Sequence, residues 1–207
     1  MDSYDRRRFH TFGFEPNYTV EVDPPFPPDG TWDCPIVEVD TDGRAHPRAV
    51  FESRTALIAR VEPAEGPAWL GMFANGGLGQ VDETFACPGP GQLCVVAEGM
   101  AYLIRVDSPI DGAVIVQDQV QHVVADEEHQ LLLLANDLDL VAVGVNGLAW
   151  QSPRLALDGL SITGADSEGI HCHAWLGDHD GSTELVTVDP RTGQVAAGPV
   201  LPDQLRY

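Results

Sequence analysis

The densest group of side chains that could do chemistry lies in the run GIHCHAWLGDHDGSTE, between Gly169 and Glu184. Side chains alternate along a strand, so a strand here would point His171 and His173 to one face. Two imidazoles on one face, followed by a turn rich in carboxylates, form a plausible zinc donor set. The candidate metal ligands are His171, His173, Asp178, His179 and Asp180. Nothing outside this run completes a known ligand spacing, so a half-exposed strand and a polar turn are the preferred interpretation, and no cofactor is predicted.

A second group could bind a partner rather than a metal. Trp and Arg side chains at strand ends are common anchors of protein interfaces. The candidate anchors are Trp150, Arg154 and Trp175. The competing interpretation is that Trp150 fills the core, while Arg154 pairs with one of the many acidic side chains.

Nucleophilic catalysis finds no support in the sequence. The chain contains no G-x-S-x-G run and no P-loop. Cys94 and Cys172 lie in apolar segments, where a thiol is usually inert. Cys87 and Cys94 flank PGPGQL, a spacing too long for a zinc half-site. A non-catalytic protein is therefore the favoured interpretation.

The charge is strongly one-sided. The 207 residues include 32 acidic and 11 basic side chains, all of them Arg, for a formal charge of −21. Residues 106–207 hold 16 of the acids and three of the arginines. Such a field repels phosphate backbones and anionic lipids, so we expect neither nucleic acid nor a membrane as partner. It favours a basic protein partner, or it serves solubility alone.

Two segments bear on the compartment. Arg6, Arg7 and Arg8 could begin an export signal, but no apolar segment follows them. The most apolar run, Gln130–Trp150, is interrupted by acidic and amide side chains and cannot cross a bilayer. We expect a cytoplasmic protein, and therefore reduced cysteines.

Apolar alternation predicts strands along most of the chain. Leu131–Leu134 reads as a buried strand, and Leu140–Val145 with Leu148–Gln151 reads as a hairpin. Asn-Gly between apolar runs is a strong signal of a type I′ turn, because both central residues need positive φ. The turns predicted on this basis, or from Asp and Gly, are Asp40–Gly43, Asn146–Gly147 and Asp189–Gly193.

The strand pattern recurs. QLCVVAEG at Gln92 matches QLLLLAND at Gln130, an offset of 38, and ADEE at Ala125 matches ADSE at Ala165, an offset of 40. LVAV at Leu140 matches LVTV at Leu185 after 45 residues. Repeats of this length built from strands resemble the blades of β-propellers, as does LVTVDPRTGQV, but the number of units is too small for a closed ring.

These patterns predict an all-β protein whose successive antiparallel hairpins form a curled sheet, a sandwich or a barrel; a small or partial propeller is the alternative. At most one short helix is expected, around residues 49–61, where two short strands fit as well. Residues 1–35, rich in Pro, are expected to flank or pack on the domain. Residues 36–207 are expected to form a single β domain with repeats of about 38–45 residues.

Two functional classes follow. The first is a non-catalytic acidic β-domain that binds a basic protein, in the manner of an immunity or inhibitor protein that covers a basic surface. The alternative is a metal-binding protein, or a small metal-dependent hydrolase, that uses the histidine-rich strand and turn. The oligomeric state stays open at this point.

Overall fold

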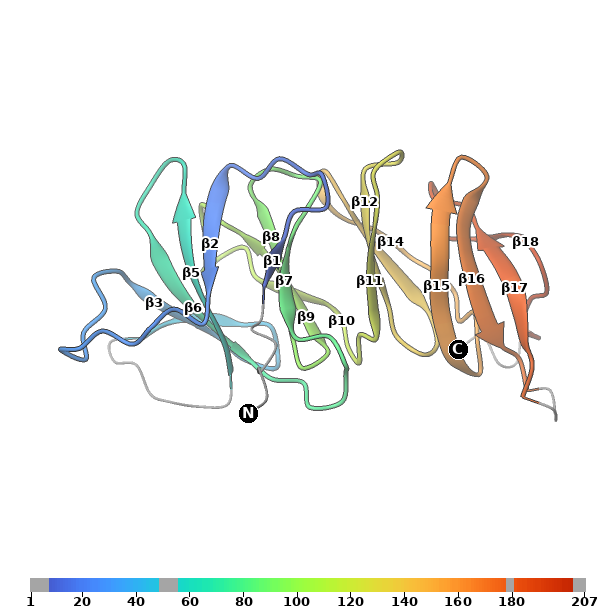
Figure 1. Ribbon diagram of the computed structural model, residues 1–207, viewed down its shortest axis with the longest axis horizontal. Helices are drawn as coiled ribbons and strands as arrows, with labels where there is room; N and C mark the ends of the chain where they lie inside the picture. Colours follow the sequence, from blue (N-terminus) through green and yellow to red (C-terminus); the bar gives the residue numbers. More distant parts are fainter. Residues whose placement is uncertain (1–7, 49–55, 178–180, 203–207) are drawn as a thin grey trace, which may run out of the picture.

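The chain folds into four β-sheets that follow one another in a row (Figure 1). This computed structural model describes residues 8–48, 56–177 and 181–202, which contain strands and no helix. The all-β prediction is therefore confirmed. We number the sheets 1 to 4 along the row.

Sheet 1 has five strands in the order β2-β5-β6-β3-β4. Its strands are β2 (Tyr18–Val22), β3 (Ile36–Val39), β4 (Ala45–Arg48), β5 (Ala56–Pro63) and β6 (Trp69–Ala74). Only the β3–β6 pair is parallel. The predicted turn between β3 and β4 forms, with the Gly43 amide donating to the Asp40 carbonyl at 3.0 Å.

Sheet 2 has the order β1-β7-β8-β9-β10. Its strands are β1 (Phe9–His10), β7 (Glu83–Ala86), β8 (Gln92–Ala97), β9 (Met100–Arg105) and β10 (Val114–Gln117). β1 runs parallel to β7, although more than 70 residues separate the two strands along the chain. The N-terminal segment thus contributes β1 to sheet 2 and β2 to sheet 1.

Sheets 3 and 4 are four-stranded antiparallel meanders. Sheet 3 contains β11 (His122–Asp126), β12 (Leu131–Ala135), β13 (Leu140–Gly144) and β14 (Gly147–Gln151). Sheet 4 contains β15 (Asp158–Asp166), β16 (Gly169–Trp175), β17 (Thr183–Val188) and β18 (Val195–Ala197). The repeated sequence runs occupy equivalent places: the offset of 38 relates β8 to β12, and the offset of 45 relates β13 to β17.

Each sheet packs face to face on the next. One core joins sheets 1 and 2 around Leu57, Phe73 and Tyr102, and a second joins sheets 2 and 3. A third joins sheets 3 and 4 around Leu133 and Ile170. Because successive side chains of a strand point to opposite faces, a strand between two cores must be apolar throughout, which explains why every residue of β12 is buried.

Two local predictions differ from the structure. The helical alternative is wrong over residues 56–61, which lie in β5; residues 49–55 are outside the described residues. The hairpin of sheet 3 forms, but its turn holds Val145 and Asn146, one residue earlier than predicted, and Gly147 pairs with Gly144. A β-bulge at Ala149 of β14, between the Ala142–Trp150 and Val143–Leu148 pairs, accompanies this shift, and Asn146 does not take the positive φ of a type I′ turn.

The two outer faces of the row differ. On sheet 1, Ile36, Leu70 and Met72 are buried under Trp32 and Cys34, which come from the segment between β2 and β3. The outer face of sheet 4 carries exposed side chains within the described residues, among them Leu185, which is 53% exposed.

Candidate functional site

The predicted histidines share the outer face of sheet 4. His171 lies opposite Thr187, and His173 lies opposite Leu185, across the β16–β17 ladder. His171 Nε2 is 3.1 Å from a carboxylate oxygen of Asp166, and its Nδ1 is 3.3 Å from the Thr187 hydroxyl. His173 Nδ1 is 3.3 Å from the Thr183 hydroxyl. Both imidazoles therefore have local polar neighbours.

Three predicted metal ligands, Asp178, His179 and Asp180, lie outside the described residues. In the part of the chain that the structure describes, no group of three or more His, Cys, Asp or Glu side chains is arranged to hold a metal ion. The structure therefore brings together two of the five candidate ligands, His171 and His173, on one strand.

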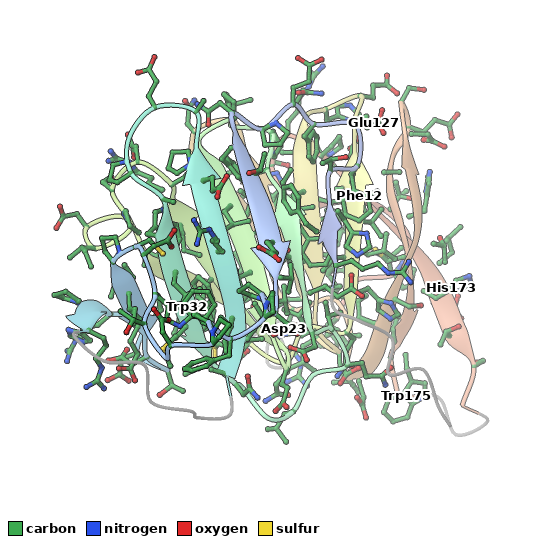
Figure 2. The ribbon with its side chains drawn as sticks, turned by 60° about the vertical axis from the view of Figure 1, so that its left-hand side comes forward. Phe12, Asp23, Trp32, Glu127, His173 and Trp175 are labelled. Carbon is green, nitrogen blue, oxygen red and sulfur yellow. The ribbon has the colours of Figure 1, made fainter. Side chains whose placement is uncertain are left out.

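Trp175 ends β16 on this same face, where it lies between Thr183 and Asp158 in the strand ladders. Figure 2 shows Trp175 and His173 together on sheet 4. The indole is half-buried, so part of its ring surface is accessible to a partner. Its role as an anchor stays a prediction.

Trp150 links two sheets. Its indole N–H donates to the Pro190 carbonyl at 2.8 Å, which ties β14 of sheet 3 to the turn after β17 of sheet 4. The same ring lies against Gly193 and packs on the core between these sheets. Trp150 is half-buried, so these contacts support the packing role of the competing interpretation, and its role as a partner anchor stays a prediction.

Arg154 is engaged by its own loop. Its Nε donates to the Ala156 carbonyl and one terminal nitrogen donates to the Leu157 carbonyl, both at 2.9 Å. The guanidinium thus satisfies two carbonyls in the connection between sheets 3 and 4, where no strand partner is available.

Carboxylates stand on three turns at one edge of sheets 3 and 4, namely the turns after β11, β15 and β17. We call this group the acidic edge; it consists of Glu127, Glu128, Asp166, Glu168 and Asp189. Figure 1 shows the turns after β11 and β15 side by side along the upper rim. The acidic excess of this half is evident in the sequence, whereas the position of these turns at one edge is not.

The local fold keeps two of these carboxyls ionised. A backbone N–H bond from Glu168, followed by the contact with His171, lowers the pKa of Asp166. A backbone N–H bond from Arg191 and the Thr192 hydroxyl lower the pKa of Asp189. His129, in the turn after β11, adds to the second effect.

The described arginines offset this charge poorly. Arg48 pairs with Glu38, and Arg60 pairs with Asp33 and Glu62, all in or beside sheet 1. Described residues 118–202 hold 11 acidic side chains and two arginines, a formal balance of −9. One of those two is Arg154, whose guanidinium is bound to backbone carbonyls.

A groove that the sequence did not predict lies between sheets 2 and 3. A cavity of about 450 Å³ lies where β1 and β7 face β11. It is lined by His10, Phe12, Gln80, Val81, Asp82, Glu83, Phe85 and Val123. This site could not be predicted from the sequence, because residues 10 and 83 are far apart along the chain and only the parallel β1–β7 pairing brings them together.

The thiols do not form a reactive site. Burial raises the pKa of Cys94 and of Cys172 to about 12, and raises that of Cys87 well above its ordinary value. A thiolate is the nucleophilic form, so these buried cysteines are poor nucleophiles at neutral pH. This agrees with their interpretation as apolar core residues.

No family model and no curated protein matches this chain. Among the described residues, no helix has the length and apolar character needed to cross a bilayer. The structure itself defines the class of this protein, which is an all-β protein of four stacked sheets with an acidic edge.

Proposed function

We propose that this protein is a non-catalytic, cytoplasmic binding domain whose acidic edge receives a basic protein partner, in the manner of an immunity or inhibitor protein. The observation that carries the proposal is the unbalanced charge of sheets 3 and 4, with 11 acidic side chains against two arginines in described residues 118–202. Charge of one sign on one surface attracts partners of the opposite sign and repels phosphate backbones.

The acidic edge suits this role because its five carboxylates stand on turns of neighbouring sheets, with one arginine, Arg191, in the same turn as Asp189. Hydrogen bonds to backbone N–H groups hold Asp166 and Asp189 in place and favour their charged forms. Carboxylates fixed in this way need no rearrangement when a cationic surface arrives, which reduces the entropic cost of binding.

The test begins with capture of partners at low salt, followed by association kinetics of the purified partner at several salt concentrations. Steered association is expected to slow markedly between about 0.1 M and about 1 M salt, because the screening length falls from about 10 Å to about 3 Å. Dissociation is expected to change less. An acidic partner, or an association rate that ignores salt, contradicts the proposal.

Two matched variants locate the effect. Glu127→Gln/Glu128→Gln/Glu168→Gln removes three charges from the acidic edge, and Glu21→Gln/Asp42→Asn/Glu65→Gln removes three exposed charges on or beside sheet 1. Both change the net charge by the same amount. We expect a several-fold slower association for the first variant and a clearly smaller effect for the second. Equal effects would assign the attraction to net charge alone.

A further inference from the structure

The groove between sheets 2 and 3 has the composition of a site for a planar cation. Three rings in it lie nearly parallel: those of His10 and Phe12 are 5.6 Å apart at 19°, and those of His10 and Phe85 are 5.3 Å apart at 20°. The Phe12 and Phe85 rings are 5.7 Å apart at 13°. Phe85 is buried, whereas Phe12 and His10 are half-exposed, so a ligand would meet the rings of these two residues.

Carboxylates stand beside these rings. Glu83 lines the groove and contacts Nε2 of His10 through one oxygen. Asp82 also lines it and accepts a bond from the backbone N–H of Glu98 at 3.1 Å. A carboxylate can accept about four hydrogen bonds through its two oxygens, so Glu83 keeps acceptor capacity for a ligand.

The groove borders the acidic edge. A Cβ built on Gly13 would lie 2.9 Å from the carboxyl carbon of Glu127, so the Glu127 carboxylate leans over the turn that carries Phe12. Figure 2 shows Glu127 directly above Phe12. Negative charge is therefore present on two sides of the aromatic rings.

The backbone holds Phe12 in an unfavourable conformation. The Phe14 amide donates to the Thr11 carbonyl at 2.8 Å, and the two residues inside this turn, Phe12 and Gly13, have φ of 51° and 82°. A bulky residue in the left-handed region is sterically disfavoured, and Asn is better suited to the position. The Phe12 ring thus packs against His10 and Phe85 despite this backbone strain.

From this geometry we infer that the groove binds the guanidinium of an arginine side chain from the basic partner. The inference rests on the proposed function, because it makes that partner the source of the arginine. A guanidinium stacks on aromatic faces and forms paired hydrogen bonds with carboxylates, whereas an ammonium offers only a compact charge. The cavity of about 450 Å³ is within the range of ligand sites in proteins.

The first arm of the test uses small probes and the whole protein. Nα-acetyl-arginine amide is titrated while the NMR signals of His10, Phe12 and Val123 are followed. The matched probe is the citrulline derivative, which has the same shape without the charge. We expect saturable shifts with the arginine probe and none with the citrulline probe. Equal responses to both probes, or no response to either, would overturn the inference.

The second arm uses variants that preserve the turn and the strand pairing. Glu83→Gln keeps the size of the side chain, and Phe12→Asn removes the ring while suiting the left-handed backbone. Each is expected to weaken binding of the arginine probe at least tenfold. Glu184→Gln, an exposed carboxylate of β17, is the control and should bind as the native protein does. Native-like binding by both groove variants would overturn the inference.

The same variants separate this inference from the proposed function. If Glu83→Gln and Phe12→Asn also weaken binding of the partner, the groove binds an arginine of that partner. If they weaken only the small probe, the partner does not use the groove; this overturns the inference and leaves salt-dependent partner binding intact. Failure of the proposed function would appear as a partner association rate that does not depend on salt, and the probe titration does not measure this rate.

Discussion

At the scale of single residues, burial divides the four cysteines into two groups. Cys87, Cys94 and Cys172 are buried, whereas Cys34 is half-exposed beside Trp32 on sheet 1. At about pH 9 a free cysteine is largely thiolate, but burial raises the pKa of Cys94 and of Cys172 to about 12. The two thiols therefore stay protonated in the folded protein at a pH where the unfolded chain ionises.

We expect iodoacetamide at about pH 9 to modify Cys34 first and to leave the other three cysteines intact while the protein stays folded. Peptide mapping by mass spectrometry measures the extent at each position. In urea, all four should react at similar rates, which controls for the chemistry of the individual peptides. Alkylation of Cys94 or Cys172 as fast as Cys34 in the folded protein would contradict the assigned burial.

Residue types alone predicted part of the candidate site. Strand alternation correctly placed His171 and His173 on one face, because it depends only on local geometry. The contacts of Arg154 could not be predicted, since they depend on the path of the loop between sheets 3 and 4. The groove residues were missed for a similar reason: His10 and Glu83 meet through a pairing between distant segments.

At the scale of elements, the turn after β17 is fixed by one close approach. Gly193 has a φ of 72°, and a Cβ on it would lie 2.5 Å from Cε3 of Trp150. Any side chain at position 193 therefore meets both a strained backbone and the indole that joins sheet 3 to sheet 4.

We expect Gly193→Ala to lower the free energy of unfolding by about 2–4 kcal/mol, of which roughly 1–2 comes from the left-handed backbone and the rest from overpacking. In a Trp150→Leu background the clash is relieved, so the same change should cost only about 1–2 kcal/mol. Urea unfolding of the four proteins measures both values. Equal costs in the two backgrounds would show that Trp150 does not constrain the turn.

Among the structural elements, turns were predicted best from the sequence, and the pairing register of the strands was predicted least well. Asp40–Gly43 and Asp189–Gly193 form turns as predicted, because the Asp40 and Asp189 carboxylates accept backbone N–H bonds within the turn itself. The turn predicted at Asn146–Gly147 lies one residue earlier, next to a bulge within β14, and bulges depend on how a strand meets its neighbours.

At the scale of the whole molecule, the formal charge of −21 opposes the compact state. We expect added sodium chloride to raise the free energy of unfolding in urea at neutral pH, because salt screens the repulsion between carboxylates. The control is the same series near the isoelectric point of about 4.3, where the repulsion and hence the salt effect should largely vanish. An equal effect at both pH values would assign it to general salt action on burial.

The fold class followed from sequence because apolar alternation and turn residues recur along the chain, and the repeats correspond to successive sheets. The stacking of those sheets into an open row did not follow. A strand that is apolar on both faces, such as β12, fits a barrel, a sandwich or a stack equally well.

The order of the sheets along the chain also describes the order in which they can form during synthesis. Sheets 3 and 4 are each built from one continuous segment, so each can pack on the sheet before it as it leaves the ribosome. Sheet 2 is different, because β1 leaves first but its partner β7 follows only after more than 70 further residues. The groove that β1 helps to line is therefore completed long after β1 has been synthesised. A nascent chain that has not yet reached β7 contains the turn with Phe12 but not the Glu83 carboxylate.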